Sequence, residues 1–126
     1  MTNQSQISKS KKKYDLIERT AKFGENIIIF LKSLNQNTIN SPLISQLIRS
    51  STSIGANYME ADTAESIKDF KHKISICKKE AKETTHWLRM IATSDPQYKI
   101  ICRKYWQEAH EFVLIFSSIN NKKSEK

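Results

Sequence analysis

The chain has 126 residues, which suits a single domain with one hydrophobic core and no need for a stabilising metal or disulfide. Only two Gly and two Pro occur, too few turn-forming residues for an all-β or loop-rich fold, so helices are expected. Lys and Arg number 21 against 13 Asp and Glu, and the formal charge of +8 favours polyanions such as nucleic acid or an anionic membrane surface.

The first residues argue against export and membrane insertion. Residues 1–13 are polar and lysine-rich, and they lack the apolar segment of a secretory signal, so we expect a flexible basic arm. The longest purely apolar run, residues 27–31, is far shorter than the roughly 18 residues of a membrane span. Cys77 and Cys102 lack a CxxC spacing and lie among apolar helical positions, which is typical of buried thiols in a reducing compartment. These features predict a cytoplasmic protein with no membrane partner.

Residues 14–34 are predicted to form a helix with two adjacent apolar rows at helical spacing. The first row consists of Tyr14, Ile17, Ala21, Gly24, Ile28 and Leu31. The second row consists of Phe23, Ile27, Phe30 and Leu34. Together the rows are wider than one partner helix would cover, which predicts an additional packing contact for this helix.

A second helix is predicted from Ser41, because Ser41 can cap it and Pro42 suits its first turn. Its apolar row consists of Leu43, Ile44, Leu47, Ile48, Ser51, Ile54, Tyr58 and Ala61. A break is expected after this row, where Asp62 and Ser66 are alternative caps for a third helix.

The third helix has the most regular apolar pattern, with steps that alternate between three and four residues. Its members are Ile67, Phe70, Ile74, Cys77, Ala81, Thr84, Leu88 and Ile91. Asp95 and Pro96 are expected to cap and open a fourth helix, and residues 122–126 to form a frayed polar tail. Four helices joined by short loops predict an all-α, antiparallel up-down-up-down four-helix bundle over residues 14–121.

No pattern in the sequence indicates catalysis. The small residues at 50–56 contain neither G-x-S-x-G nor S-x-x-K, and they follow no strand, so close helix packing is the favoured interpretation. His72, His86 and His110 lack a metal-ligand spacing, and no glycine-rich phosphate loop is present. We therefore expect a non-enzymatic protein with no catalytic residues, no metal and no cofactor.

Asn57 and Glu60 are three residues apart and therefore neighbours on one edge of the second helix. We expect this structural polar pair to share a hydrogen-bond network that fixes the register or the oligomer, because buried polar groups must be paired. General-acid chemistry by Glu60 is the weaker alternative, since no second carboxylate or His stands at a defined spacing from it.

The third helix also carries basic side chains at helical spacing beside its apolar row, which we call the basic ridge. Its members are Lys68, Lys71, His72, Lys79, Lys82, His86 and Arg89. Two interpretations stay open. The ridge either contacts nucleic-acid phosphates or is a solvated face held by pairs such as Asp69 with Lys73 and Lys79 with Glu83.

Residues 51–91 resemble the central signature of the bacterial four-helix-bundle proteins encoded by intervening sequences in 23S ribosomal RNA genes. The first half of that pattern, S-I-x-A-N-x-x-E-A, runs from Ser53 to Ala61. The second half, D-F-x-H-K-x-x-I-x-x-K-E-A-x-E-T-x-x-W-L, runs from Asp69 to Leu88. The segment WQEAHEFVLIFSSI is also similar to the last helix of this family.

The resemblance implies a homopentameric ring, with subunit contacts through the second apolar row of the first helix and through Trp87 or Trp106. A related branch, the accessory variability determinant of diversity-generating retroelements, works with a reverse transcriptase and binds nucleic acid through a basic surface. Carried over to the basic ridge, this implies RNA or DNA as the partner. The alternative is an adaptor or assembly scaffold that binds a protein and no nucleic acid.

Overall fold

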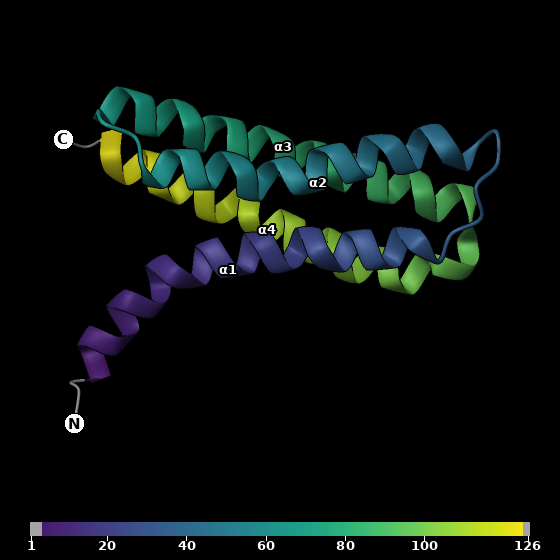
Figure 1. Cartoon of the computed structure of the whole chain (residues 1–126), viewed down its shortest axis with the longest axis horizontal. Helices are drawn as coiled ribbons and strands as arrows, with labels where there is room; N and C mark the ends of the chain where they lie inside the picture. Colours follow the sequence, from purple (N-terminus) through teal and green to yellow (C-terminus); the bar gives the residue numbers. More distant parts are fainter. Residues whose placement is uncertain (1–3, 125–126) are drawn as a thin grey trace.

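The computed structural model describes residues 4–124, with side chains for residues 16–122. Its elements in chain order are α1 (Gln4–Lys32), α2 (Asn40–Asp62), α3 (Ile67–Ser94), the 3-10 turn η1 (Pro96–Tyr98) and α4 (Lys99–Ser124). No strand occurs within residues 4–124, which confirms the all-α class and the four helices. Figure 1 shows the helices side by side, each returning along the helix before it.

α1 begins at Gln4, well before the start that we expected at Tyr14. Its first turns contain Gln, Ser and Lys without Gly or Pro, and Lys and Gln are good helix formers. In Figure 1 these turns extend away from the other three helices. The side chains of residues 1–15 and 123–126 lie outside the described ones, so the basic arm and the polar tail stay predictions.

α1 contributes to the core mainly through its second apolar row, Phe23, Ile27, Phe30 and Leu34, all of which are buried. The expectation that this row would be left for subunit contacts is therefore wrong. In the first row, Ala21 and Ile28 are exposed instead. The second row faces the core because Phe23 packs edge-on against two aromatic rings of α4. Its ring centroid lies 6.2 Å from that of Tyr105 and 5.6 Å from that of Phe112.

The apolar rows of the other helices face the core largely as predicted. α2 buries Ile44, Leu47, Ile54, Tyr58 and Ala61. α3 buries the row from Ile74 to Ile91. α4 buries Cys102, Tyr105, Ala109, Phe112, Val113 and Phe116. Ile48 of α2 and Ile67 at the first turn of α3 are exceptions, at 37% and 60% exposed.

Side-chain hydrogen bonds identify the capping residues at the N-termini of α2 and α3. Asn37 accepts hydrogen bonds from the backbone nitrogens of Ile39 and Asn40 (3.0 and 2.7 Å), so α2 begins at Asn40 rather than after a Ser41 cap. Ser66, not Asp62, caps α3, because its hydroxyl accepts from the backbone nitrogen of Asp69 at 3.0 Å.

The small residues of α2 allow close contact with α1, as predicted. A Cβ atom added to Gly55 would lie 3.3 Å from Thr20 Oγ1, and one added to Gly24 would lie 3.5 Å from Thr52 Cγ2. On its other side α2 contacts α3 through a hydrogen bond between Ser50 and the hydroxyl of Thr84, at 2.9 Å. Both of these hydroxyl side chains are fully buried. The small residues at 50–56 therefore serve the packing of α2 against its neighbours.

Candidate nucleic-acid interface

The basic ridge lies on the outward face of α3. Six members are exposed, and Lys71 is half-buried. The ridge does not run directly beside the core row, because Ile74, Cys77 and Leu88 project from the opposite side of the helix. The side chains of the basic ridge therefore form a broad strip that faces solvent.

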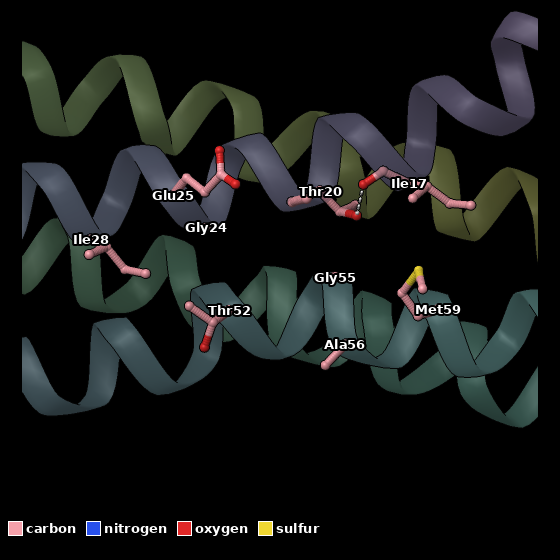
Figure 2. Close-up of a pocket in the computed structure, with 10 residues that line it drawn as sticks. Ile17, Thr20, Gly24, Glu25, Ile28, Thr52, Gly55, Ala56 and Met59 are labelled. Carbon is pink, nitrogen blue, oxygen red and sulfur yellow. Dashed lines mark hydrogen bonds between the residues drawn. The ribbon is translucent and has the colours of Figure 1, made fainter.

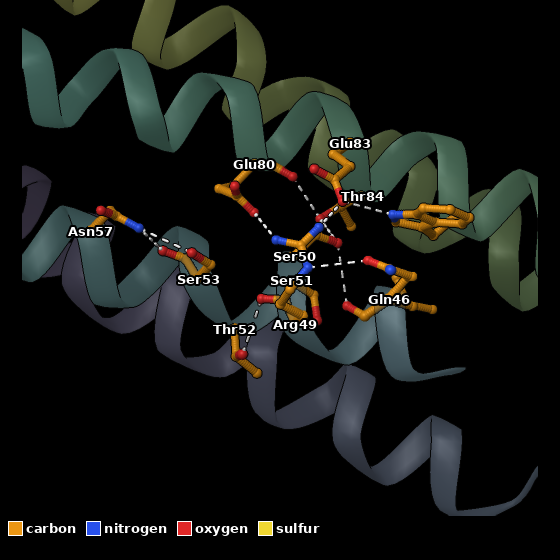
Figure 3. A network of polar contacts seen from close by, with 12 residues as sticks. Gln46, Arg49, Ser50, Ser51, Thr52, Ser53, Asn57, Glu80, Glu83 and Thr84 are labelled. Atoms are coloured by element: carbon orange, nitrogen blue, oxygen red, sulfur yellow. Dashed lines mark hydrogen bonds and ion pairs between the residues drawn. The ribbon is translucent and has the colours of Figure 1, made fainter. Parts of the chain in front are cut away.

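Two carboxylates of α3, Glu80 and Glu83, lie on its other edge, toward α2, where a cation binds both. Arg49 of α2 binds Glu80 Oε2 at 3.0 Å and also forms an ion pair with Glu83 (Figure 3). Trp87 Nε1 donates to Glu83 at 2.9 Å. Lys79 thus does not take Glu83 as its partner, contrary to one of the two interpretations of the ridge.

The edge of α3 toward α4 carries a second regular row, at alternating steps of four and three residues. This row consists of Lys71, Ser75, Lys78, Lys82, Thr85, Arg89 and Ala92. α4 carries a matching row, which consists of Lys99, Arg103, Trp106, His110, Val113, Ser117 and Asn120. We call these two rows together the α3/α4 seam.

Contacts at both ends show that the two rows face one another. At one end, Asn120 Nδ2 donates to the backbone oxygen of Lys71 at 3.1 Å and to Ser75 Oγ at 3.0 Å. At the other end, Ala92 lines a surface pocket of about 330 Å³ together with Lys99, Arg103, Trp106 and Gln107 of α4. Because helices are rigid between these ends, the intervening residues of each row also lie along the seam.

The seam is strongly cationic. Its six Lys and Arg side chains are Lys71, Lys78, Lys82, Arg89, Lys99 and Arg103, and neither row contains Asp or Glu. The carboxylates of α4 face another direction, since Glu108 and Glu111 lie near Arg19 of α1 at 3.9 and 3.4 Å. The fold therefore sorts charge among the described residues, with the ion pairs of Glu80, Glu83, Glu108 and Glu111 on the α2 and α1 sides and a row of cations, free of Asp and Glu, on each side of the seam.

Sequence reasoning found the α3 half of this surface and missed Lys78 and the whole α4 half. The family resemblance had assigned Trp106 to a subunit contact rather than to this surface; its side chain is 39% exposed and stacks on His110 with ring centroids 5.1 Å apart and an angle of 17° between planes. The regular three-four spacing of the α4 row was the available signal. Only the contacts of Ala92 and Asn120, however, show that this row faces α3.

Asn57 and Glu60 do not form the shared network that we expected. Asn57 Nδ2 donates to the backbone oxygen and to the hydroxyl of Ser53, at 2.8 and 3.0 Å, one turn earlier on the same helix. Glu60 instead pairs with Lys73 of α3 at 2.5 Å, and this contact also replaces the expected pair of Asp69 with Lys73. The two side chains therefore serve different contacts, one within α2 and one between α2 and α3.

Both cysteines are buried and unpaired. Burial raises the pKa of the Cys77 thiol to about 12 and that of Cys102 to about 11, so neither is a reactive thiolate at neutral pH.

Among residues 16–122, no cluster of three or more His, Cys, Asp or Glu is placed to hold a metal ion. None of the described helices combines the length and apolarity of a membrane span.

An apolar groove lies between α1 and α2, on a different side of the molecule from the ion pairs of Arg49. Its volume is about 240 Å³, and Figure 2 shows Ile17, Ile28, Ala56 and Met59 around it. Ile28 and Met59 are 36% and 53% exposed. This groove, rather than the second row of α1, therefore carries exposed apolar surface of the first helix.

Residues 12–97 match a family model described as 23S rRNA-intervening sequence protein, which is more than half of the chain. The chain belongs to this family. The match confirms the resemblance seen in residues 51–91, and it ends before α4, so the α4 half of the seam lies outside it.

This 23S rRNA-intervening sequence protein is also similar to a solved structure from Bacteroides thetaiotaomicron. That crystal structure is of a protein with unknown function from the S23 ribosomal protein family. The two are 29% identical with a TM-score of 0.73, and the match covers 83% of this chain and 97% of the other. A comparison with curated proteins finds no match.

Proposed function

We propose that this 23S rRNA-intervening sequence protein is a non-enzymatic, cytoplasmic protein that binds RNA or DNA through the basic ridge and the α3/α4 seam. The proposal rests on one observation, the sorting of charge. Five Lys and Arg side chains besides Lys71 line the seam, and neither of its two rows contains Asp or Glu, while Glu80 and Glu83 on the opposite edge of α3 are held by Arg49. Such a one-sided cationic surface attracts a phosphate backbone with little dependence on sequence.

Reversing the charge of three basic side chains on α3 tests this proposal. The variant carries Lys79→Glu, Lys82→Glu and Arg89→Glu, all at exposed positions of α3. Its binding to labelled RNA and to duplex DNA is measured by fluorescence anisotropy, and we expect at least a tenfold loss of affinity for both, because several phosphate contacts are replaced by repulsion.

A matched control separates local from global charge. Lys22→Glu, Lys32→Glu and Lys122→Glu reverse three exposed lysines away from the seam, on α1 and at the end of α4. Each set removes six units of charge, three times two, and lowers the formal charge from +8 to +2. Equal losses in the two variants would mean that only net charge matters, and no binding by the wild-type protein would remove the proposal.

We further propose that the antiparallel up-down-up-down four-helix bundle is the subunit of a homopentamer, as the family resemblance implies. Its support is the groove between α1 and α2, where Ile28 and Met59 leave apolar surface in contact with solvent. A ring would repeat the basic surface and raise avidity for a long polyanion. Light scattering tests this, and Met59→Glu is expected to lower the measured mass.

A second candidate function is an adaptor for a protein partner, such as a reverse transcriptase, without nucleic-acid binding. The same groove favours it, because a depression lined by Ile17, Ala56 and Met59 can receive an apolar side chain. In that case the positive charge steers association and keeps the protein soluble. The adaptor predicts that Met59→Glu abolishes partner binding and that the triple reversal on α3 changes only its rate.

A further inference from the structure

We propose that Trp106 and His110 form a stacking platform for an unpaired base of single-stranded RNA, with Lys99 and Arg103 holding the adjacent phosphates. This inference rests on the proposed nucleic-acid binding and adds a preference that charge alone would not produce. Its site lies on α4, outside the family match over residues 12–97.

The position of Trp106 in the structure carries the argument. Most large aromatic side chains of the described residues are in or against the core, where Phe23, Phe112 and Phe116 are completely or almost completely buried. Trp106 instead is 39% exposed and is not part of the core cluster. Leaving so large an apolar ring in contact with water costs free energy, so a partner that covers it is favoured.

The ring is also held in a fixed orientation. Trp106 and His110 are one helical turn apart and stack at 17° with their centroids 5.1 Å apart, which restricts rotation of the indole. A planar aromatic surface that is already ordered loses little conformational entropy when a base stacks on it. The stacked pair thus differs from a lone surface tryptophan.

Cationic side chains surround the exposed indole. Lys99 and Arg103 line the same pocket of about 330 Å³ as Trp106, and its opposite wall is Ala92 of α3. Arg89 precedes Ala92 by one turn in the α3 row. A base on the indole would therefore have cations near the phosphates on either side, which is the combination found in proteins that bind single strands.

The geometry favours a single strand over a duplex. In a duplex the bases are already stacked and paired, so the exposed face of Trp106 cannot stack on one of them without disruption of the pairs. An RNA loop or strand presents unstacked bases, and proteins recognise these by stacking on aromatic rings and Arg planes. The α3/α4 seam is thus best fitted to an unpaired RNA segment.

The test compares strands on the full-length protein. Fluorescence anisotropy measures the affinity for a labelled RNA strand of about 12 nucleotides, for the DNA strand of the same sequence, and for the matching RNA duplex. We expect the RNA strand to bind more tightly than the duplex. Trp106→Ala should weaken strand binding by roughly 5-fold or more, the range of base–aromatic stacking, and leave duplex binding within twofold.

Two further variants control for structure. Trp106→Phe keeps an aromatic ring and should restore most of the preference for the strand. Ile100→Ala removes another exposed apolar side chain of α4, 88% exposed and outside the seam row, and should change nothing. Tryptophan fluorescence quenching on addition of the RNA strand provides an independent readout.

The outcomes distinguish this inference from the proposed function. Binding of strand and duplex with equal affinity, unaltered in Trp106→Ala, would overturn the platform and leave phosphate binding in place. Binding of the DNA strand only would overturn the choice of RNA. A fall in oligomer mass in Trp106→Ala would overturn the platform by making Trp106 a subunit contact, and no binding to any probe would overturn both proposals.

Discussion

The two glycines between α1 and α2 give a prediction in which one substitution stabilises and the other destabilises the protein. Gly24→Ala and Gly55→Ala make the same chemical change in the middle of a helix. Each replaces the less favourable residue by the most favourable one, a gain of up to about 1 kcal/mol in helix propensity. The difference between the variants must then come from what the new methyl group meets.

The surroundings of the two methyl groups differ. At Gly24 the nearest atom is Thr52 Cγ2 at 3.5 Å, an ordinary van der Waals contact, so most of the propensity gain should remain. At Gly55 the nearest atoms are Thr20 Oγ1 at 3.3 Å and the Thr20 carbonyl carbon at 3.4 Å, and the backbone of α1 cannot move away as a flexible side chain would. Overpacking of this kind costs about 1–3 kcal/mol, which exceeds the gain.

We therefore expect Gly24→Ala to be more stable than wild type by about 0.5–1 kcal/mol and Gly55→Ala to be less stable by up to about 2 kcal/mol. Urea unfolding followed by circular dichroism measures both, at two protein concentrations so that any change of oligomer is seen. Equal effects of the two substitutions, or a stabilised Gly55→Ala, would refute the assignment of Gly55 as the point of closest approach between α1 and α2.

Two further predictions concern charge and ionisation. Arg49→Met should destabilise the protein by about 1–3 kcal/mol in urea unfolding, because it leaves the carboxylate of Glu80, 8% exposed, without its cation; Arg49→Lys, which keeps the charge, should recover part of the loss. The buried thiols should make stability fall as pH rises from about 9 to about 12, since Cys77 stays protonated in the folded state while the unfolded thiol ionises. The expected slope is about 1.4 kcal/mol per pH unit for each thiol that ionises only on unfolding. Cys77→Ala and Cys102→Ala together should flatten the wild-type curve, and an unchanged curve would exclude this cause.

The sequence predicted the core of α2, α3 and α4 well, because each of these helices has one dominant apolar row with a polar face opposite. α1 was harder to interpret, since both of its rows are apolar and periodicity cannot rank them. In the structure packing decides between them, because Phe23 and Phe30 both contact the ring of Tyr105 on α4, which only the fold brings near. Ile28, equally apolar, was left in contact with solvent.

The candidate interface was predictable only in part, for a related reason. Lys82 and Arg89 were found because spacing along one helix is visible in the sequence. Lys99, Arg103 and Trp106 belong to another helix, and their proximity depends on the register between α3 and α4. That register is fixed by contacts such as Asn120 with Ser75 and by the pocket at Ala92, neither of which has a signature in the chain itself.

The most direct test of the account is the salt dependence of binding to duplex DNA, for the wild-type protein and for Lys82→Gln, Arg89→Gln and Arg103→Gln combined. If the five cations of the seam other than Lys71 contact phosphates, log K should fall against log salt with a slope of up to about −4.5, because each contact contributes about 0.9. The triple variant should reduce the steepness by up to about 2.7, three times that contribution. A wild-type slope that the variant leaves unchanged would place phosphate binding elsewhere on the molecule and contradict the assignment of the α3/α4 seam.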